Sequence, residues 1–356
     1  MNVNETLVPV RNPNVPQNKE NPRMRIAIAL AAVAAVLALE TARAATVSGS
    51  ATLYANPFAG LPDSAYAWGG TDVTMASPLI ALNQTAGYMR MSSTVGATVS
   101  GWAQVTTATP FQAGTIISTG YTGYNSGSTT YSVGIGSPAL LTHSVDIGGA
   151  PSNSPWLTTH GVPVTSNTLR VDVSKLYGYS SSYWFTDIDK LLVIPDELVY
   201  LPATGGTDAA HNSPGTLGSY EGVNVVDLQS STPYINRSTT DPHWFVLDIT
   251  GGPKKVGAIV TDMPATVQTL DIQKPDGLGG WTTLASVTNG LAGEVVAVKF
   301  DSPLAALSQL RFYYNYTGGN ETRVNEVMLF SVVVPEPVSA VLLGLGLAFL
   351  PRRRRG

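Results

Sequence analysis

The sequence lacks cysteine and contains few charged residues. With no cysteine among 356 residues, disulfide scaffolds, thiolate metal centres and cysteine nucleophiles are all excluded. A chain without disulfides must rely on its hydrophobic core, which a domain of more than about 100 residues can supply. Charged residues make up 12% of the chain, and glycine, serine, threonine and tyrosine are abundant. This composition is typical of short strands joined by tight turns.

Positive charge is especially scarce in the middle of the chain. Of 20 basic and 24 acidic residues, nine and four lie within residues 1–44 and 334–356, which leaves 11 against 20 and a net charge of −9 for the middle. An acidic middle region repels phosphate backbones. Nucleic acid is therefore excluded as a partner.

Signatures of common enzymes are also missing. The sequence contains no G-x-S-x-G elbow, P-loop or EF-hand loop. Its four histidines are scattered, and none has the i, i+4 partner of a helical zinc site. Asp146, Asp208 and Asp241 each lie within three residues of a histidine, and these local pairs are interpreted as solvated polar turns. We therefore predict a non-enzymatic protein without a cofactor.

The C-terminus carries a tripartite segment. Pro335-Glu336-Pro337 precedes an apolar run, residues 338–350, and the chain then ends on a basic cluster formed by Arg352, Arg353, Arg354 and Arg355. This arrangement resembles the PEP-CTERM sorting signal of Gram-negative bacteria that make extracellular polysaccharide. The resemblance implies export, recognition by an exosortase-type protease near Pro335-Glu336-Pro337, and delivery to the cell surface or matrix.

The length of the apolar run favours transient membrane association. Its 13 residues span roughly 20 Å as a helix, against a hydrocarbon core of about 30 Å. The alternative is an ordinary tail anchor, because snorkelling arginines and local thinning of the bilayer cover part of the difference.

The N-terminus predicts a secretory signal peptide. Met24-Arg25 precedes an apolar run over residues 26–39, and Ala42-Arg43-Ala44 follows as an A-x-A site with cleavage before Ala45. Either Met1 or Met24 is the true start. We expect the middle of the chain to be translocated, since both basic ends obey the positive-inside rule.

Between the two ends the pattern predicts strands and no convincing helix. Strands are expected at Trp244–Ile249, Lys255–Thr261, Thr266–Lys274, Trp281–Val287, Glu294–Phe300, Gln309–Tyr316 and Val324–Val333. Turn residues such as Pro275-Asp276-Gly277 separate them. This spacing predicts an all-β fold, an antiparallel β-sandwich or jelly roll.

The order of these segments resembles a known family. Trp244-Phe245, Asp276-Gly277, Trp281-Thr282-Thr283, Leu310-Arg311-Phe312 and Asn325-Glu326-Val327 follow the order of discoidin-like domains of the galactose-binding superfamily. The resemblance covers residues 204–333. It implies a jelly roll that binds glycans or other surface ligands through loops at one end and seldom performs chemistry.

A weaker copy precedes this segment. Trp102, Arg170 and Asp189 lie 142, 141 and 137 residues before Trp244, Arg311 and Glu326, which suggests tandem duplication, although chance alignment is the alternative. The predicted organisation is a leader and signal peptide (1–44), a first module (45–200), a second module (201–333) and the sorting tail (334–356).

Charged residues inside the strands are interpreted as structural. Asp248 and Arg311 are predicted to form a buried carboxylate–guanidinium pair, and Glu326 to hydrogen-bond a neighbouring strand end. Asp187 and Asp189 are expected on one strand face, as a calcium ligand pair or glycosidase pair would require. Solvated carboxylates are the alternative.

Sugar binding needs aromatic faces beside polar groups. Tyr121, Tyr124, Tyr183 and Trp184 are the candidates. Together with the two ends, they predict an exported surface or matrix protein that binds exopolysaccharide, with an exosortase and the secretion machinery as partners. The alternatives are a structural matrix protein without a specific ligand and a glycan-processing enzyme.

Overall fold

The computed structural model describes the chain from residue 45 to residue 333 with gaps. The described residues are 45–58, 61–70, 74–77, 89–93, 98–122, 130–146, 156–177, 184–208, 226, 228, 234–236, 243–262, 267–288, 295–316, 322–324 and 326–333. The predicted signal peptide with Ala42 and Ala44, and the sorting tail with its Pro-Glu-Pro and arginine cluster, lie outside these residues, as do Tyr124 and Tyr183. Among the described residues, no helix has the length and apolar character needed to cross a membrane.

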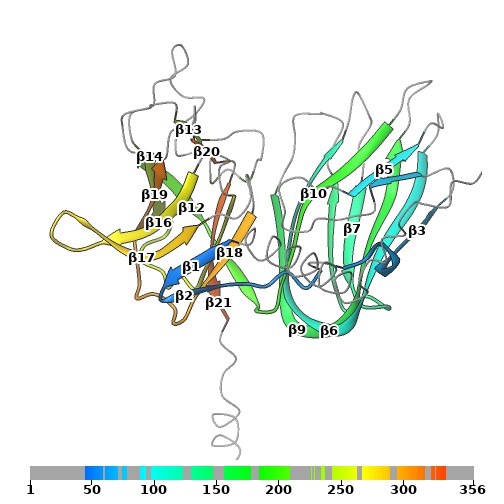
Figure 1. Cartoon of the computed structure of the whole chain (residues 1–356), viewed down its shortest axis with the longest axis horizontal. Helices are drawn as coiled ribbons and strands as arrows, with labels where there is room; N and C mark the ends of the chain where they lie inside the picture. Colours follow the sequence, from blue (N-terminus) through cyan, green and yellow to red (C-terminus); the bar gives the residue numbers. More distant parts are fainter. Residues whose placement is uncertain are drawn as a thin grey trace, which may run out of the picture. The chain divides into compact units, whose positions relative to one another are not determined.

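The described chain is almost entirely antiparallel β-structure, which confirms the predicted fold class (Figure 1). A short 3-10 turn, η1 (Asp63–Ala65), precedes β3. The strands separate into two sandwiches, each with its own core.

The first sandwich is one eight-stranded sheet in the order β4-β5-β10-β6-β9-β7-β8, with β3 on the free edge of β6. Its strands are β3 (Tyr66–Gly70), β4 (Thr74–Ser77), β5 (Met89–Ser93), β6 (Thr98–Thr122), β7 (Thr130–Ile135), β8 (Leu141–Asp146), β9 (Trp156–Tyr177) and β10 (Trp184–Ile194). The burial of β7 alternates residue by residue, as expected when one face of a sheet is covered.

This sheet folds over on itself because β6 and β9 bend together. Their register shifts between Thr106 and Phe111, and such irregularities bend a strand and increase its twist. Thr107 stabilises the bend, since its hydroxyl lies 2.8 Å from the carbonyl oxygen of Thr109 and 3.2 Å from that of Asn167. Figure 1 shows both long strands curving through the bend. The two halves of the sheet enclose one core, which includes Val105, Ile116, Val133, Val171 and Leu191.

The second sandwich has two separate sheets. The six-stranded sheet has the order β1-β17-β16-β19-β14-β12, and the five-stranded sheet the order β11-β21-β15-β18-β2. The strands are β1 (Thr46–Gly49), β2 (Ala51–Leu53), β11 (Leu198–Leu201), β12 (Ala203–Asp208), β14 (His243–Ile249), β15 (Ala258–Asp262), β16 (Val267–Pro275), β17 (Trp281–Thr288), β18 (Val295–Phe300), β19 (Gln309–Tyr316) and β21 (Val327–Val332); a separate pair is formed by β13 (Tyr234–Asn236) and β20 (Thr322–Val324). Phe245 stacks on Phe312 at 5.4 Å in the core between the sheets.

The first two strands of the described chain belong to the second sandwich. Although residues 45–200 were assigned to the first module, β1 pairs with β17 and β2 pairs with β18. The chain therefore begins in the second sandwich, forms the first sandwich between β3 and β10, and returns to the second. Local sequence patterns gave no indication of this, because strand pairing across more than 200 residues leaves no local periodicity.

The two sandwiches share a third core. Ile117, Leu192 and Ile194 lie on the outer face of β6 and β10, and they pack against Val260 and Phe330 on the outer face of the five-stranded sheet. Each of these five side chains is buried. The contact between the two sandwiches is therefore buried like the core of each sandwich.

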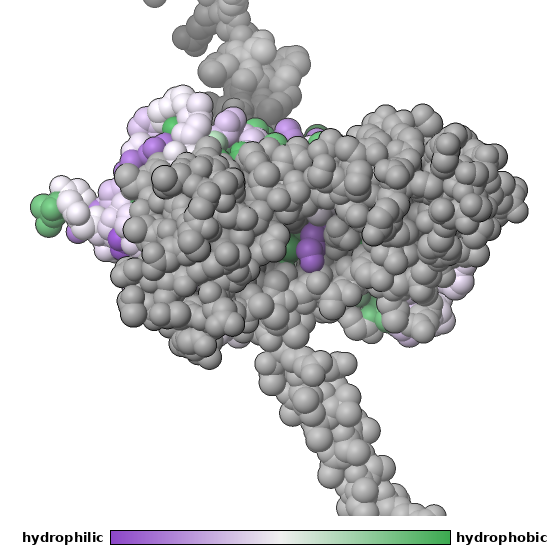
Figure 2. All heavy atoms as spheres, turned by 90° about the horizontal axis from the view of Figure 1, so that it is seen from above, coloured by the Kyte–Doolittle hydropathy of each residue, from purple (hydrophilic) through white to green (hydrophobic). Residues whose placement is uncertain are grey.

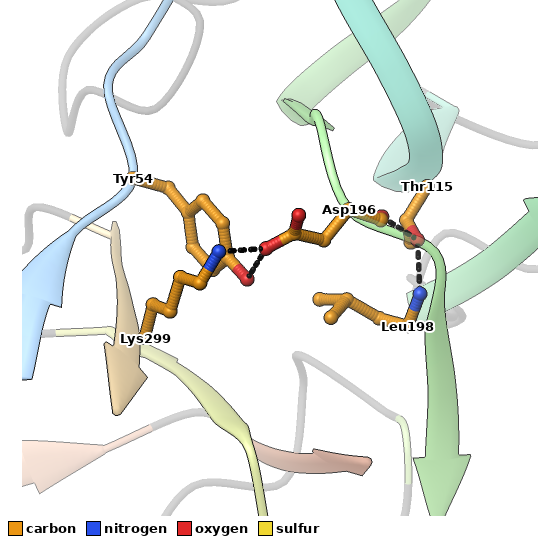
Figure 3. Close-up of polar contacts among 5 residues, drawn as sticks. All are labelled: Tyr54, Thr115, Asp196, Leu198 and Lys299. Atoms are coloured by element: carbon orange, nitrogen blue, oxygen red, sulfur yellow. Dashed lines mark hydrogen bonds and ion pairs between the residues drawn. The ribbon is translucent and has the colours of Figure 1, made fainter. Parts of the chain in front are cut away.

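Polar contacts at Asp196 border this junction (Figure 3). Its carboxylate accepts hydrogen bonds from the Tyr54 hydroxyl at 2.7 Å and from Lys299 Nζ at 2.5 Å. Its carbonyl oxygen accepts from Thr115 Oγ1 at 2.8 Å, and the same hydroxyl accepts from the Leu198 amide at 2.8 Å. Burial, followed by the hydrogen bond and the charge of Asp196, raises the pKa of Tyr54, so the phenol stays protonated as a donor.

Candidate functional site

The outer face of the six-stranded sheet carries the most distinctive side-chain cluster of the described residues. Leu310, Phe312 and Tyr314 of β19 point into the core, so the alternate residues Arg311 and Tyr313 lie on the opposite face. In the strand pairing, Trp244 of β14 is opposite Tyr313. Four adjacent strands, β17, β16, β19 and β14, therefore position the cluster.

Arg311 is at the centre of three aromatic rings. Its guanidinium carbon lies 4.8 Å from the ring centroid of Trp281, 5.5 Å from that of Tyr313 and 5.8 Å from that of Trp244. All four side chains are partly exposed. Such distances are within the range of favourable cation–π contact. Burial lowers the pKa of Arg311, but an arginine remains charged at neutral pH.

A β-bulge places Trp281 beside Arg311. The pairing of β16 with β17 shifts between Ile272 and Gln273, so that Ile272 is opposite Ala285 and Gln273 is opposite Thr283. Leu284 is the extra residue, and it packs against the core. Without the bulge, strict alternation would give Trp281 the orientation of the core-facing residues Ala285 and Val287.

Hydrogen-bonding groups surround the rings on the same face. Gln273 donates from Nε2 to Thr283 Oγ1 at 3.1 Å and accepts from Arg311 Nε at 2.6 Å. Ser286 donates to Asp271 at 2.6 Å. The face combines flat rings with fixed donors and acceptors, which suits a ligand that is itself partly apolar and partly polar.

The predicted ion pair between Asp248 and Arg311 is wrong. Asp248 accepts a hydrogen bond from Gln309 Nε2 at 2.7 Å, and Arg311 bonds to Gln273 instead. The prediction treated β19 as buried on both faces, whereas a two-layered sandwich buries only one. The alternation of Leu310, Phe312 and Tyr314 in the sequence already indicates that Arg311 lies on the outer face of the sheet.

A similar arginine occurs in the first sandwich. Arg170 lies 4.5 Å from the ring centroid of Trp102, and in both sandwiches the arginine is two residues before the strand partner of the tryptophan. Arg170 differs in its polar partner, because Asp172 accepts hydrogen bonds from its Nε and Nη2 at 2.8–3.0 Å.

A second polar cluster lies inside the first sandwich. Ser118 Oγ is 2.8 Å from His143 Nε2, and His143 Nδ1 is 2.8 Å from Thr159 Oγ1. The Tyr131 hydroxyl lies 3.2 Å from Ser118. Ser118 has no exposed surface and His143 is 4% exposed, so a substrate has no access to this serine. We interpret the cluster as a hydrogen-bond network of the core. The prediction of solvated histidine–aspartate pairs is wrong for the histidines His143 and His243, which are both buried.

The residues predicted to bind sugar are not part of the Arg311 cluster. Tyr121 is in β6 and Trp184 in β10, both in the first sandwich, and the structure describes only their backbones. The Asp187–Asp189 pair depends on regular alternation, which a register shift between Ile188 and Lys190 interrupts. Within the described ranges, no group of three or more His, Cys, Asp or Glu residues is arranged to hold a metal ion.

Fold and face together define an antiparallel β-sandwich protein with an aromatic and polar sheet surface. No protein-family model and no curated protein matches the sequence. Solved structures similar to it include a family 32 carbohydrate-binding module of Clostridium perfringens NanJ in complex with galactose (17% identity, 38% of this chain, 99% of that chain, TM-score 0.32). Others are an F5/8 type C domain from Bacteroides fragilis (12%, 37%, 99%, 0.31) and a fucolectin from striped bass serum (12%, 79%, 99%, 0.29).

Proposed function

We propose that this protein is an exported, non-catalytic carbohydrate-binding protein, and that its ligand lies on the outer face of the six-stranded sheet. The observation that carries the proposal is the partly exposed cluster of Trp244, Trp281, Tyr313 and Arg311 beside hydrogen-bonded Gln273. Sugar rings present C–H surfaces that pack on aromatic planes and hydroxyls that take hydrogen bonds. This face offers both within one patch.

Apolar ligands fit the surface less well. The exposed large hydrophobic side chains among the described residues are Trp68, Leu140, Val162, Leu278 and Val333, which are dispersed along the sequence. In Figure 2 hydrophobic colour on the described residues is confined to small spots. Among the residues drawn in colour there, no large contiguous apolar patch of the kind that protein or lipid partners bind is visible.

The test of the proposal is retention of the purified protein on insoluble neutral and acidic polysaccharides. Trp281→Ala removes one ring from the face, and we expect weaker binding by about 1–2 kcal/mol, or roughly 5–30-fold in Kd. Trp68→Ala is the matched control, because Trp68 is a 49% exposed tryptophan of the first sandwich and its loss should leave retention unchanged. Failure of the wild-type protein to bind any polysaccharide would refute the proposal.

Export and sorting by the two ends form the second part of the proposal. It is supported by the sequence patterns around Ala45 and Pro335-Glu336-Pro337. Intact mass of protein recovered from the producing cell should show an N-terminus at Ala45, the last residue before β1 begins at Thr46. Replacing the three residues of Pro335-Glu336-Pro337 by alanine should hold the protein in the inner membrane; unchanged secretion would contradict exosortase-type sorting.

A further inference from the structure

Arg311 is a cation without an anionic partner in the described part of the chain. Its Nε donates to the neutral amide oxygen of Gln273, and no described carboxylate lies within ion-pair distance of it. The acids on the same face have other partners: Asp271 accepts from Ser286, and Asp248 from Gln309. A partly buried charge without a counter-ion is unfavourable unless something else is gained.

The surroundings hold the guanidinium in place while leaving donors unused. Gln273 is itself hydrogen-bonded to Thr283, so its amide oxygen is oriented toward Arg311. The three rings contact the guanidinium without accepting in-plane hydrogen bonds. A guanidinium has five N–H donors in a fixed fork, and only the one on Nε is used here, so the four on the terminal nitrogens remain.

Arg170 shows what a purely structural arginine looks like in the same protein. It also lies over a tryptophan ring, but its Nε and Nη2 both donate hydrogen bonds to the carboxylate of Asp172. The charge of Arg170 is therefore compensated within the protein. The difference between the two arginines is the carboxylate, which the first sandwich supplies and the second does not.

We propose that the ligand of this face is an acidic polysaccharide. A uronate carboxylate of the sugar accepts hydrogen bonds from the Arg311 guanidinium, as the carboxylate of Asp172 does from Arg170. The inference rests on the proposed function and names its substrate class. A carboxylate matches the planar fork of a guanidinium, and charge-assisted hydrogen bonds are about twice as strong as neutral ones. The sugar ring that carries the carboxylate then packs on Trp244 or Trp281.

The experiment compares two ligands with the same sugar backbone, namely trigalacturonate and its fully methyl-esterified form, in which each carboxylate is replaced by a neutral methyl ester, titrated into the full-length protein. Short oligomers keep long-range repulsion from the acidic protein small. We expect the acid to bind at least tenfold more tightly than the ester. Arg311→Gln should remove this preference by weakening acid binding to the level of the ester, and Arg311→Lys, which keeps the charge but loses the fork, should keep part of it.

Arg170→Gln is the control and should retain the full preference. Thermal unfolding of each variant shows whether the fold is intact, and the comparison of acid with ester in the wild-type protein needs no variant. Equal affinity for the two oligomers, no binding of either, or an unchanged preference in folded Arg311→Gln would overturn the inference. The proposed function fails separately, only if the neutral and acidic polysaccharides of the retention assay also do not bind.

Discussion

At the scale of single residues, the same side-chain type has different roles according to what its neighbours supply. Arg170 and Arg311 both lie over tryptophan rings, yet one has Asp172 as its partner and the other the neutral Gln273. The first arrangement stabilises a sheet surface. The second leaves a charge available to a ligand, and this difference carries the proposed specificity for acidic sugars.

His143 predicts a pH dependence of stability. Burial lowers its pKa from 6.5 to about 4, so between these values the unfolded chain binds more protons than the folded chain does. The stabilisation is therefore complete above about pH 6.5 and is lost as the pH falls toward 4, with a magnitude of about 3 kcal/mol.

The measurement is urea unfolding between pH 4 and 7.5. Comparison with His143→Gln, which hydrogen-bonds but does not titrate, removes the contribution of carboxylates. The free energy of unfolding of the wild-type protein should decrease more steeply below pH 6.5 than that of the variant. Parallel pH profiles would show that His143 takes up its proton without affecting the fold.

At the scale of secondary-structure elements, the strands of the second half were well predicted. The segment Gln309–Tyr316 has the predicted bounds, and Trp281–Thr288 extends one residue beyond them, because regular alternation and turn residues are local properties. The same alternation also indicates that Arg311 lies on the outer face, but Arg311 was wrongly predicted to be buried. The bulge at Leu284, which brings Trp281 to the outer face, was not predictable, since it depends on pairing with β16.

The edge strand β2 offers a test of the topology. Ala51 is buried in the core of the second sandwich, while its neighbour Thr52 is exposed. Ala51→Asp places a charge in that core, and we expect a loss of several kcal/mol in the free energy of unfolding. Thr52→Asp, one residue away on the opposite face, should change it by less than about 0.5 kcal/mol.

Binding to polysaccharide is the second readout for these two variants. If Ala51 packs in the core of the second sandwich, Ala51→Asp destabilises the sandwich that carries the Arg311 cluster. Ligand binding by this variant should therefore be weaker when it is measured near the unfolding midpoint of the variant. Equal stability of the two variants would contradict the assignment of β2 to this sandwich.

At the scale of the whole described molecule, the shared core makes the two sandwiches interdependent. Ile117 packs in the core between the sandwiches and Ile116 in the core of the first, and neither side chain is exposed. We expect a single unfolding transition for the wild-type protein, because separating the sandwiches exposes apolar surface on both.

Ile116→Ala and Ile117→Ala form a matched pair for this expectation. Both should cost about 2–5 kcal/mol, but only Ile117→Ala loosens the contact between the sandwiches. Its urea transition should broaden or separate into two steps, while that of Ile116→Ala stays single. Two transitions already present in the wild-type protein would show that the junction does not couple the sandwiches.

The pairing of β1 with β17 has a consequence for the time course of biosynthesis. Gly49 and Trp281 are 232 residues apart, and a ribosome adds about 5–20 residues per second. The first strands therefore remain without their partners for roughly 10–50 s after they are made. Over that interval the protein depends on whatever keeps an unpaired strand from aggregating.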